Sequence, residues 1–260
     1  MKTITARDNP AYKALQRLVS KASERKARRL SVLEGAHVVG AALDAGLAPR
    51  QVLLRQGSRD DPEARALAAR AGQAEAIELA DPLFDALSGL DSPPAIMAVL
   101  PTPAGRPVPP RAGFVLGVED VQDPGNVGTL LRSAAAAGVG HVLLSGSCAF
   151  AWSPKVLRAG QGAHFSLNIV EGADLPAFLG TFEGTSVALC GEGALDLYSL
   201  DLTGPLVFLV GNEGAGLSAL LEEAATVRAA IPMPGRAESL NAGVAGSIAL
   251  FEAVRQRRRE

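Results

Sequence analysis

Three polar side chains in the second half of the chain have the types and spacing for anion or hydroxyl chemistry. Asn126 and Arg132 lie six residues apart in PGNVGTLLR, and Glu213 follows the apolar run LVFLV. Asn126 alone would fit the N-cap of a helix opening near Pro124. An Arg on so apolar a helix either extends to solvent or is held for an anionic partner. Glu213 is either a solvated loop carboxylate or the anchor of a cation such as Arg132.

A third polar group precedes the last apolar stretch, in IPMPGRAESLNAGVAGSIALFEAVRQR. The helical spacing of Leu240, Val244, Ile248, Phe251 and Val254 predicts a helix over about 239–255 with these side chains in the core. Residues two apart point about 200° apart on a helix. We therefore expect Ser239 to be the N-cap and Asn241 to point away from the cap position. The small residues of this helix, Gly243 and Gly246 among them, predict close packing within the chain or across a dimer.

Several other chemistries lack their motifs. The segment GAGLSA fits the loose dinucleotide pattern G-x-G-x-x-A, but the next strand ends in Pro-Met-Pro-Gly rather than in the acidic residue that holds a ribose. No nucleotide P-loop, H-E-x-x-H or G-x-S-x-G motif is present, and the three histidines have no neighbours that suggest a triad or a metal site. Aromatic residues are 4% of the chain, too few for a base-stacking platform. We expect no metal.

The elements that must position these groups alternate along the chain. Apolar runs predict six strands after residue 113, at 114–118, 141–144, 167–170, 186–189, 206–210 and 227–231. Helices between them indicate an α/β domain with a mostly parallel sheet covered on both faces. Ligands of such sheets bind at the carboxyl ends of the strands, where Asn126 and Glu213 are expected.

The first hundred residues predict a smaller α/β layer. A basic helix near 9–29 is followed by strands at 31–33, 51–54, 76–79 and 95–100, with helices near 35–45, 62–71 and 81–88, the last beginning at Asp81-Pro82. The proline-rich segment PTPAGRPVPP predicts a semi-rigid linker. We therefore expect one domain at 1–100, a linker at 101–112 and a second domain at 113–260.

Charge is concentrated at the two ends of a chain whose formal net charge is −2. Residues 1–30 hold nine basic and two acidic side chains, and RQRRR stands at 255–259. These segments are either phosphate-contacting arms or solvated helix surfaces. The candidate phosphate contacts are Lys13, Arg17, Lys21, Arg25, Arg28 and Arg29.

The cellular compartment is expected to be the cytoplasm. Cys148 and Cys190 are spaced like isolated buried thiols in a reducing compartment. The N-terminus lacks the continuous apolar stretch of a signal peptide, and glycines and polar residues interrupt the longest uncharged segment. No membrane segment is expected.

The three polar segments together resemble the three motifs of the SpoU/TrmH family of RNA 2′-O-ribose methyltransferases in the SPOUT superfamily. The matching pieces are N-x-G-x-x-x-R at 126–132, VGNEGAGLS and IPMPGRAESLNAGVAGSIALFE. The first domain is similar to the family's L30-like substrate-binding domain, through ITARDNPAYKAL, VLEGAHVVGAAL and IMAVLP. The resemblance implies S-adenosylmethionine as cofactor, a deep trefoil knot in the second domain, and a homodimer whose active sites borrow residues across the interface.

The resemblance also implies roles for individual residues. Arg132 matches the family's catalytic arginine, Asn126 its partner, Glu213 the glutamate of the second motif, and Ser239 and Asn241 the polar pair of the third. Cofactor contacts are implied for Val210, Gly211, Asn212, Gly191, Ile231, Met233 and Leu240. Our hypothesis is that Arg132 binds the phosphate beside the target ribose and polarises its 2′-hydroxyl, with Glu213 and Asn126 fixing the guanidinium.

The separate first domain favours ribosomal RNA, and the large subunit in particular, because the family's minimal tRNA enzymes generally lack such a domain. A tRNA 2′-O-methyltransferase and a non-catalytic RNA-binding protein that keeps the fold are the alternatives.

Overall fold

The computed structural model describes residues 1–191 and 195–258, which form two compact units. Unit 1 comprises residues 1–103 and 152–165, and unit 2 comprises residues 104–151 and 166–260 apart from those outside the described ranges. The boundary after Pro103 falls within the predicted linker. The return of 152–165 to unit 1 was not predicted from the sequence.

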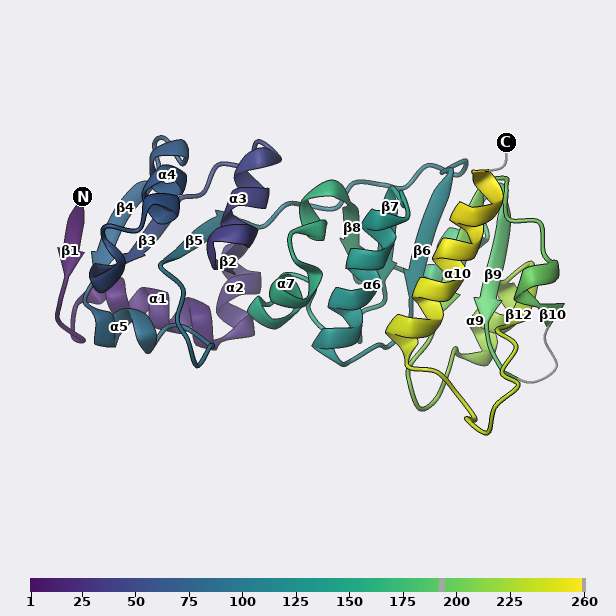
Figure 1. Ribbon diagram of the computed structural model, residues 1–260. Helices are drawn as coiled ribbons and strands as arrows, with labels where there is room; N and C mark the ends of the chain where they lie inside the picture. The colour runs from purple at the N-terminus through teal and green to yellow at the C-terminus, as the bar shows by residue number, and fades with distance from the viewer. Residues whose placement is uncertain (192–194, 259–260) are drawn as a thin grey trace. The chain divides into compact units, whose positions relative to one another are not determined.

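Unit 1 is built on a five-stranded mixed sheet in the order β1-β4-β3-β5-β2 (Figure 1). Strands β1, β4 and β3 run parallel to one another, and β5 pairs antiparallel with both β3 and β2. The strands are β1 (Lys2–Ile4), β2 (Leu30–Glu34), β3 (Gln51–Arg55), β4 (Glu75–Leu79) and β5 (Ile96–Pro101). The helices are α1 (Pro10–Ser20), α2 (Ala22–Arg28), α3 (Ala36–Asp44), α4 (Pro62–Arg70), α5 (Asp81–Asp85) and α7 (Pro154–Gly160).

The predicted basic helix is two helices. Lys21 has extended backbone angles (φ −117°, ψ 117°), ends α1 and begins α2. The core of unit 1 holds α1 in place through Tyr12, Leu15 and Leu18, and the Tyr12 hydroxyl donates to the main-chain oxygen of Leu83 at 3.0 Å. Asp81 does not cap α5, because Ala80 occupies the N-cap position and the Asp81 carboxylate accepts from the Gly57 amide at 2.6 Å.

Helix α7 packs against β2 within unit 1 through a buried ion pair. Arg158 Nη1 lies 2.6 Å from Glu34 Oε2, and the two side chains are 25% and 2% exposed. Glu34 also accepts from the Ser88 hydroxyl and from the Gly89 amide. Residues distant in sequence therefore satisfy one carboxylate in the interior of unit 1.

Unit 2 is a seven-stranded sheet in the order β10-β12-β9-β11-β6-β7-β8, and every strand pair within the described residues is parallel. The strands are β6 (Phe114–Val118), β7 (His141–Leu144), β8 (Asn168–Glu171), β9 (Thr185–Leu189), β10 (Leu195–Asp196), β11 (Leu206–Val210) and β12 (Val227–Ala230). The helices are α6 (Pro124–Ala136), α8 (Leu175–Leu179), α9 (Ala219–Ala224) and α10 (Ala242–Arg257). The predicted parallel sheet is confirmed.

Successive side chains of β11 point to opposite faces of the sheet, and each face packs against a different layer of helices. Val207 and Leu209 belong to one core cluster with Leu175 of α8 and Leu221 of α9. Val210 faces the opposite layer, where α6 and α10 pack together in front of the sheet (Figure 1). The proline-rich segment is fixed to unit 2 from residue 104 onward, because Asn168 bonds both the main-chain nitrogen and oxygen of Arg106 at 2.8 and 2.9 Å.

Helix α10 buries its small-residue face, as predicted, but not the large apolar stripe that we expected in the core. Gly243 and Gly246 are buried, and a Cβ on Gly246 would lie 2.4 Å from Leu130 of α6. The small-residue face therefore packs within the chain. Val244 and Phe251 of the predicted core stripe are instead 45% and 47% exposed.

The basic C-terminal end of α10 is used for structure rather than left free. Arg255 pairs with Glu252 at 2.7 Å. Arg257 donates to the main-chain oxygens of Leu202 and Gly204 and lies over the Phe114 ring at 4.3 Å. Arg259 lies outside the described residues. These contacts argue against the second phosphate-contacting arm that the sequence suggested.

Cys148 and Cys190 are free and half-buried rather than buried. Burial is the main cause that raises the pKa of the Cys148 thiol. Among the helices of residues 1–191 and 195–258, none has the length and apolar character needed to cross a bilayer.

Candidate functional site

The candidate site lies at the carboxyl edge of the unit 2 sheet, where four neighbouring parallel strands end. In sheet order these strands are β12, β9, β11 and β6. Because they run parallel, the segments that follow them, beginning at Ile231, Cys190, Gly211 and Glu119, leave the sheet at the same edge. This edge is where open α/β sheets bind ligands.

The loop after β11 is held in one conformation by Asn212. Its Oδ1 accepts from the amides of Gly214 and Ala215 at 2.8 and 3.1 Å, and its Nδ2 donates to the main-chain oxygen of Asp120 at 2.9 Å. The main chain of Asn212 exchanges two hydrogen bonds with Gly216. Each polar group of Asn212 thus has at least one partner within the protein, so Asn212 holds the loop. The cofactor contact that we expected of it stays a prediction.

Gly211 begins this loop at a position where no side chain fits. A Cβ there would lie 2.2 Å from the Gly216 carbonyl carbon. Across the loop, the Glu119 carboxylate accepts from the Ser218 amide and hydroxyl at 2.7 and 2.8 Å. The strand ends of β6 and β11 are therefore fastened to each other on both sides of Glu213.

Three polar residues from the three sequence segments form one directional chain of hydrogen bonds. The Val244 amide donates to Asn241 Oδ1 at 3.2 Å, and Asn241 Nδ2 donates to Asn126 Oδ1 at 2.8 Å. Asn126 Nδ2 in turn donates to Glu213 Oε1. The beginning of α10, the first turn of α6 and the loop after β11 are joined through these side chains.

Two of these positions differ from the expected local structure. Asp123, not Asn126, is the N-cap of α6, and its Oδ1 accepts from the Asn126 amide at 2.9 Å. Asn241, not Ser239, is the N-cap of α10, which begins three residues later than predicted. Ser and Asn are equally good caps, and the bond from Asn241 to Asn126 selects Asn241.

Arg132 extends from the exposed side of α6, two turns beyond Asn126. Within the described residues the structure records no ion pair or hydrogen bond for its guanidinium. Our expectation that Glu213 and Asn126 fix the guanidinium is therefore wrong for this conformation, because Asn126 uses both ends of its amide on Glu213 and Asn241.

The other expected site residues lie around this chain without joining it. Ser239 is exposed, and no hydrogen bond is recorded for it in the described part of the chain. The main chains of Gly191, Ile231 and Leu240 likewise have no recorded partner among the described residues, and a Cβ on Gly191 would meet nothing within 4 Å. Met233 is 37% exposed, and Val210 is buried at the end of β11, where its oxygen accepts from the Glu119 amide.

Sequence reasoning missed Asp120, which lies at the same edge with a left-handed backbone (φ 54°). The Ser145 hydroxyl accepts from its amide at 3.0 Å and donates to its Oδ1 at 2.9 Å, and Asn212 bonds its oxygen. A non-glycine residue at positive φ costs free energy and is found more often at functional sites. The sequence carries no signal for it beyond an acidic residue after a strand.

The six cations expected to contact RNA fall into different classes in unit 1. Arg25 is 6% exposed, and its Nη1 donates to the main-chain oxygens of Leu18 and Val19 at 2.8 and 2.6 Å. Burial lowers its pKa. Arg25 therefore closes the end of α1 and is not a phosphate contact, which corrects our expectation. Lys13, Arg17, Lys21, Arg28 and Arg29 are exposed.

No group of three or more His, Cys, Asp and Glu side chains suited to a metal ion occurs in the part of the chain that the structure describes.

Comparison with protein-family models and known proteins gives consistent matches. Residues 113–251 match the model of the SpoU rRNA Methylase family, and residues 9–98 match the MRM3-like substrate binding domain. A 23S rRNA (guanosine(2553)-2′-O)-methyltransferase of Bacillus subtilis is 30% identical over 254 residues, which are 96% of this chain and 98% of that protein. A 23S rRNA (uridine(2479)-2′-O)-methyltransferase of Streptomyces viridochromogenes is 33% identical over 98% of this chain and 92% of its own length.

Solved structures agree over nearly the whole length. The SpoU methyltransferase AviRb of Streptomyces viridochromogenes, in complex with AdoMet, has a TM-score of 0.85 and 29% identity, covering 97% of this chain and 100% of its own. An AdoMet-bound rRNA methyltransferase from Sinorhizobium meliloti has a TM-score of 0.87 and 29% identity, covering 98% and 97%.

Proposed function

Because the chain belongs to the SpoU rRNA Methylase family, we propose that it transfers a methyl group from S-adenosylmethionine to a ribose 2′-hydroxyl of ribosomal RNA. The observation that carries the proposal is the hydrogen-bonded chain from Asn241 through Asn126 to Glu213. It assembles all three family motifs at one sheet edge, beside an arginine that no recorded contact neutralises. A protein that only bound RNA would need cations but not this assembly.

The residues at the edge fit S-adenosylmethionine. Uncharged main-chain groups at Gly191, Ile231 and Leu240 have no recorded partner in the described chain and suit the donor and acceptor edges of an adenine. A Cβ on Gly191 would meet no described atom within 4 Å. When bound, the cofactor would supply a sulfonium methyl group to an oxygen nucleophile: the S–CH3 bond would break as the O–CH3 bond forms, S-adenosylhomocysteine would leave, and the hydroxyl proton would pass to solvent. We assign Val210, Gly211 and Met233 to the walls of this site.

Arg132 receives the RNA. We propose that its guanidinium binds the phosphate beside the target ribose and stabilises the negative charge that develops on the 2′-oxygen. A guanidinium stays protonated in proteins and is therefore a poor base, so we assign Arg132 to charge stabilisation. Asn126, Glu213 and Asn241 fix the loops around it, and exposed Ser239 is available to the substrate.

We further infer that the protein is a homodimer. On α10 the large apolar side chains of Val244 and Phe251 are exposed and that of Ile248 is half-buried, beginning one turn after Asn241. A second copy covering this stripe would bury apolar area beside the site and supply residues to it. Phe251→Glu is expected to give a monomer by light scattering.

The remaining features follow the family. We infer a trefoil knot in unit 2, supported by the course of the chain from β12 through 231–241 to α10, which packs on α6 and β11. Unit 1 is proposed as an L30-like RNA-binding domain, the large ribosomal subunit as the substrate particle, and the cytoplasm as the location.

The test is incubation of the purified protein with methyl-labelled S-adenosylmethionine and unmodified total RNA, followed by size separation. We expect label in large-subunit rRNA and its loss by at least about 100-fold with Arg132→Ala. Arg132→Lys keeps the positive charge but loses the planar guanidinium, which can donate two parallel hydrogen bonds to a phosphate, so the activity of this variant should also fall. Label in tRNA would overturn the substrate, and no label with RNA binding intact would favour a non-catalytic binder.

A further inference from the structure

One face of α1 is built for an anionic, hydrogen-bonding ligand. Lys13, Gln16, Arg17 and Ser20 follow at spacings of three, four and seven residues, which places them on one side of the helix. The helix contains no acidic residue, and its other side is buried through Tyr12, Leu15 and Leu18.

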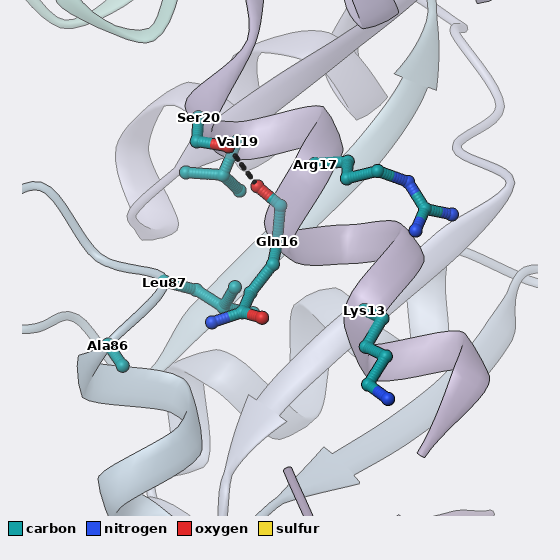
Figure 2. A pocket seen from close by; sticks show the side chains of 7 residues that line it. All are labelled: Lys13, Gln16, Arg17, Val19, Ser20, Ala86 and Leu87. Atoms are coloured by element: carbon teal, nitrogen blue, oxygen red, sulfur yellow. Dashed lines mark hydrogen bonds between the residues drawn. The ribbon is translucent and has the colours of Figure 1, made fainter. Parts of the chain in front are cut away.

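This face lines a pocket of about 460 Å³ together with Val19, Ala86 and Leu87 (Figure 2). In Figure 2 the Gln16 carboxamide lies beside Leu87, whereas Lys13 and Arg17 extend away from it. The Ser20 hydroxyl donates to the Gln16 main-chain oxygen at 2.7 Å, so it does not occupy the carboxamide. The pocket thus has an apolar wall with one amide and a basic rim.

The cations of the rim differ from their neighbours in α2. Arg28 pairs with Glu24 at 2.9 Å, and Arg25 donates to main-chain oxygens. For Lys13 and Arg17, no ion pair or hydrogen bond is recorded in the described residues. The uncompensated charge of this basic segment therefore includes the rim of the pocket.

We propose that this pocket takes one unpaired nucleotide of the RNA substrate, with its base against Ala86 and Val19 and its edge read by the Gln16 carboxamide. Lys13 and Arg17 bind the flanking phosphates. The inference rests on the proposed function for the nature of the ligand. Proteins read RNA sequence mainly in single strands, where bases are free to leave the stack. A glutamine amide offers one donor and one acceptor and so distinguishes bases by their edges.

The experiment measures binding of the full-length protein to short labelled oligo(A), oligo(C) and oligo(U), and to an RNA duplex, at several salt concentrations. We expect tighter binding of single strands than of duplex, with a preference for one base. Gln16→Ala should weaken binding of the preferred strand by about fivefold or more, so that the three oligonucleotides bind equally well. The salt dependence of binding should stay unchanged.

Arg17→Ala is compared with Lys21→Ala, a matched loss of one exposed cation one turn further along. Arg17→Ala should lower the slope of log affinity against log salt by about 0.7 and weaken single-strand binding more than Lys21→Ala does. Equal effects of these two variants would contradict the pocket.

An unchanged base preference in Gln16→Ala, or equal binding of all strands by the unsubstituted protein, would also overturn the proposal. Methyl transfer to rRNA is measured in parallel. If the unsubstituted protein transfers no methyl group to rRNA, the proposed function is refuted. The oligonucleotide results test separately whether the pocket binds a nucleotide.

Discussion

The strand-edge site of unit 2 and the α1 face of unit 1 both carry polar side chains, but they satisfy them differently. At the sheet edge, Asn126, Asn212 and Glu119 bond to other protein groups, and Arg132 alone among the charged groups we singled out has no recorded partner in the described chain. On α1, Lys13 and Arg17 both lack a recorded partner there. Groups that position a reaction are bonded within the protein, while groups that bind a polyanion must stay available to it.

The largest effect should come from breaking the chain of hydrogen bonds at the sheet edge. Asn126→Asp replaces the donor to Glu213 with a second carboxylate. Displacement of these loops should reduce the methyl-transfer rate by about 100-fold, while RNA binding stays within a few-fold. Single-turnover rates at saturating RNA measure it.

The double variant Asn126→Asp/Glu213→Gln is the control, because it restores a carboxylate–amide pair with the donor reversed. We expect it to recover part of the rate. A single variant as active as the unsubstituted protein would show that the chain does not position the site.

The next effect concerns stability, in the interior of unit 1. Arg158→Ala leaves the Glu34 carboxylate, 2% exposed, without its cation. Because an unpaired buried charge is costly and Arg158 is itself partly exposed, we expect a loss of about 2 to 4 kcal/mol in the free energy of unfolding. Urea denaturation measures it.

Arg70→Ala is the matched control, since its ion pair with Asp44 is exposed on both sides. That variant should change stability by less than about 1 kcal/mol. Equal effects of the two substitutions would mean that the Glu34 pair is not buried in solution.

A smaller effect separates the two classes of cation in the basic segment. Arg25→Ala removes the donors to the carbonyls at the end of α1, so unfolding should become easier by about 1 to 3 kcal/mol. The salt dependence of RNA binding by Arg25→Ala should match that of the unsubstituted protein. Arg17→Ala should instead lower that salt dependence and leave the free energy of unfolding unchanged. A reduced salt slope in Arg25→Ala, with the fold intact, would return Arg25 to the RNA interface.

Much of the frame was predictable from local patterns. Apolar runs such as 114–118 and 206–210 became strands at the predicted residues, because a strand buried on both faces needs continuous hydrophobicity. The topological rule for parallel sheets then placed the segments at 119–123 and 211–218 at one edge. That they are neighbours depends on the pairing of β6 with β11, which local patterns did not predict.

The errors arose where tertiary packing outweighed a local signal. Hydrophobic periodicity assigned Val244 and Phe251 to the core, yet Gly243 and Gly246 allow α6 so close that the small face is buried instead. Nothing local distinguishes Arg25 from Arg17 in a basic helix, and only the turn at Lys21 directs Arg25 back onto α1. Likewise, the partner of Glu34 is more than a hundred residues away.

The smallest predicted effect lies at the amino edge of the unit 2 sheet, opposite the candidate site, and concerns pH. Asn168 bonds both the nitrogen and the oxygen of Arg106, which fixes the orientation of its amide. Its Nδ2 therefore donates its second proton to Nδ1 of His141, 3.0 Å away, so this nitrogen must be unprotonated. Burial, and then the charge of Arg106, lower the pKa of His141 below 6.5.

In the unfolded chain His141 regains its ordinary pKa and takes up a proton first as the pH falls. The unfolded state then binds more protons than the folded state, so His141 favours folding fully above about pH 6.5 and progressively less below it, down to the lowered pKa. Unfolding free energies measured from pH 7.5 to 5 should decline, and His141→Gln should reduce that decline because a glutamine does not titrate. An identical pH dependence in the variant would mean that His141 does not titrate differently in the folded and unfolded chains, and that other groups cause the decline.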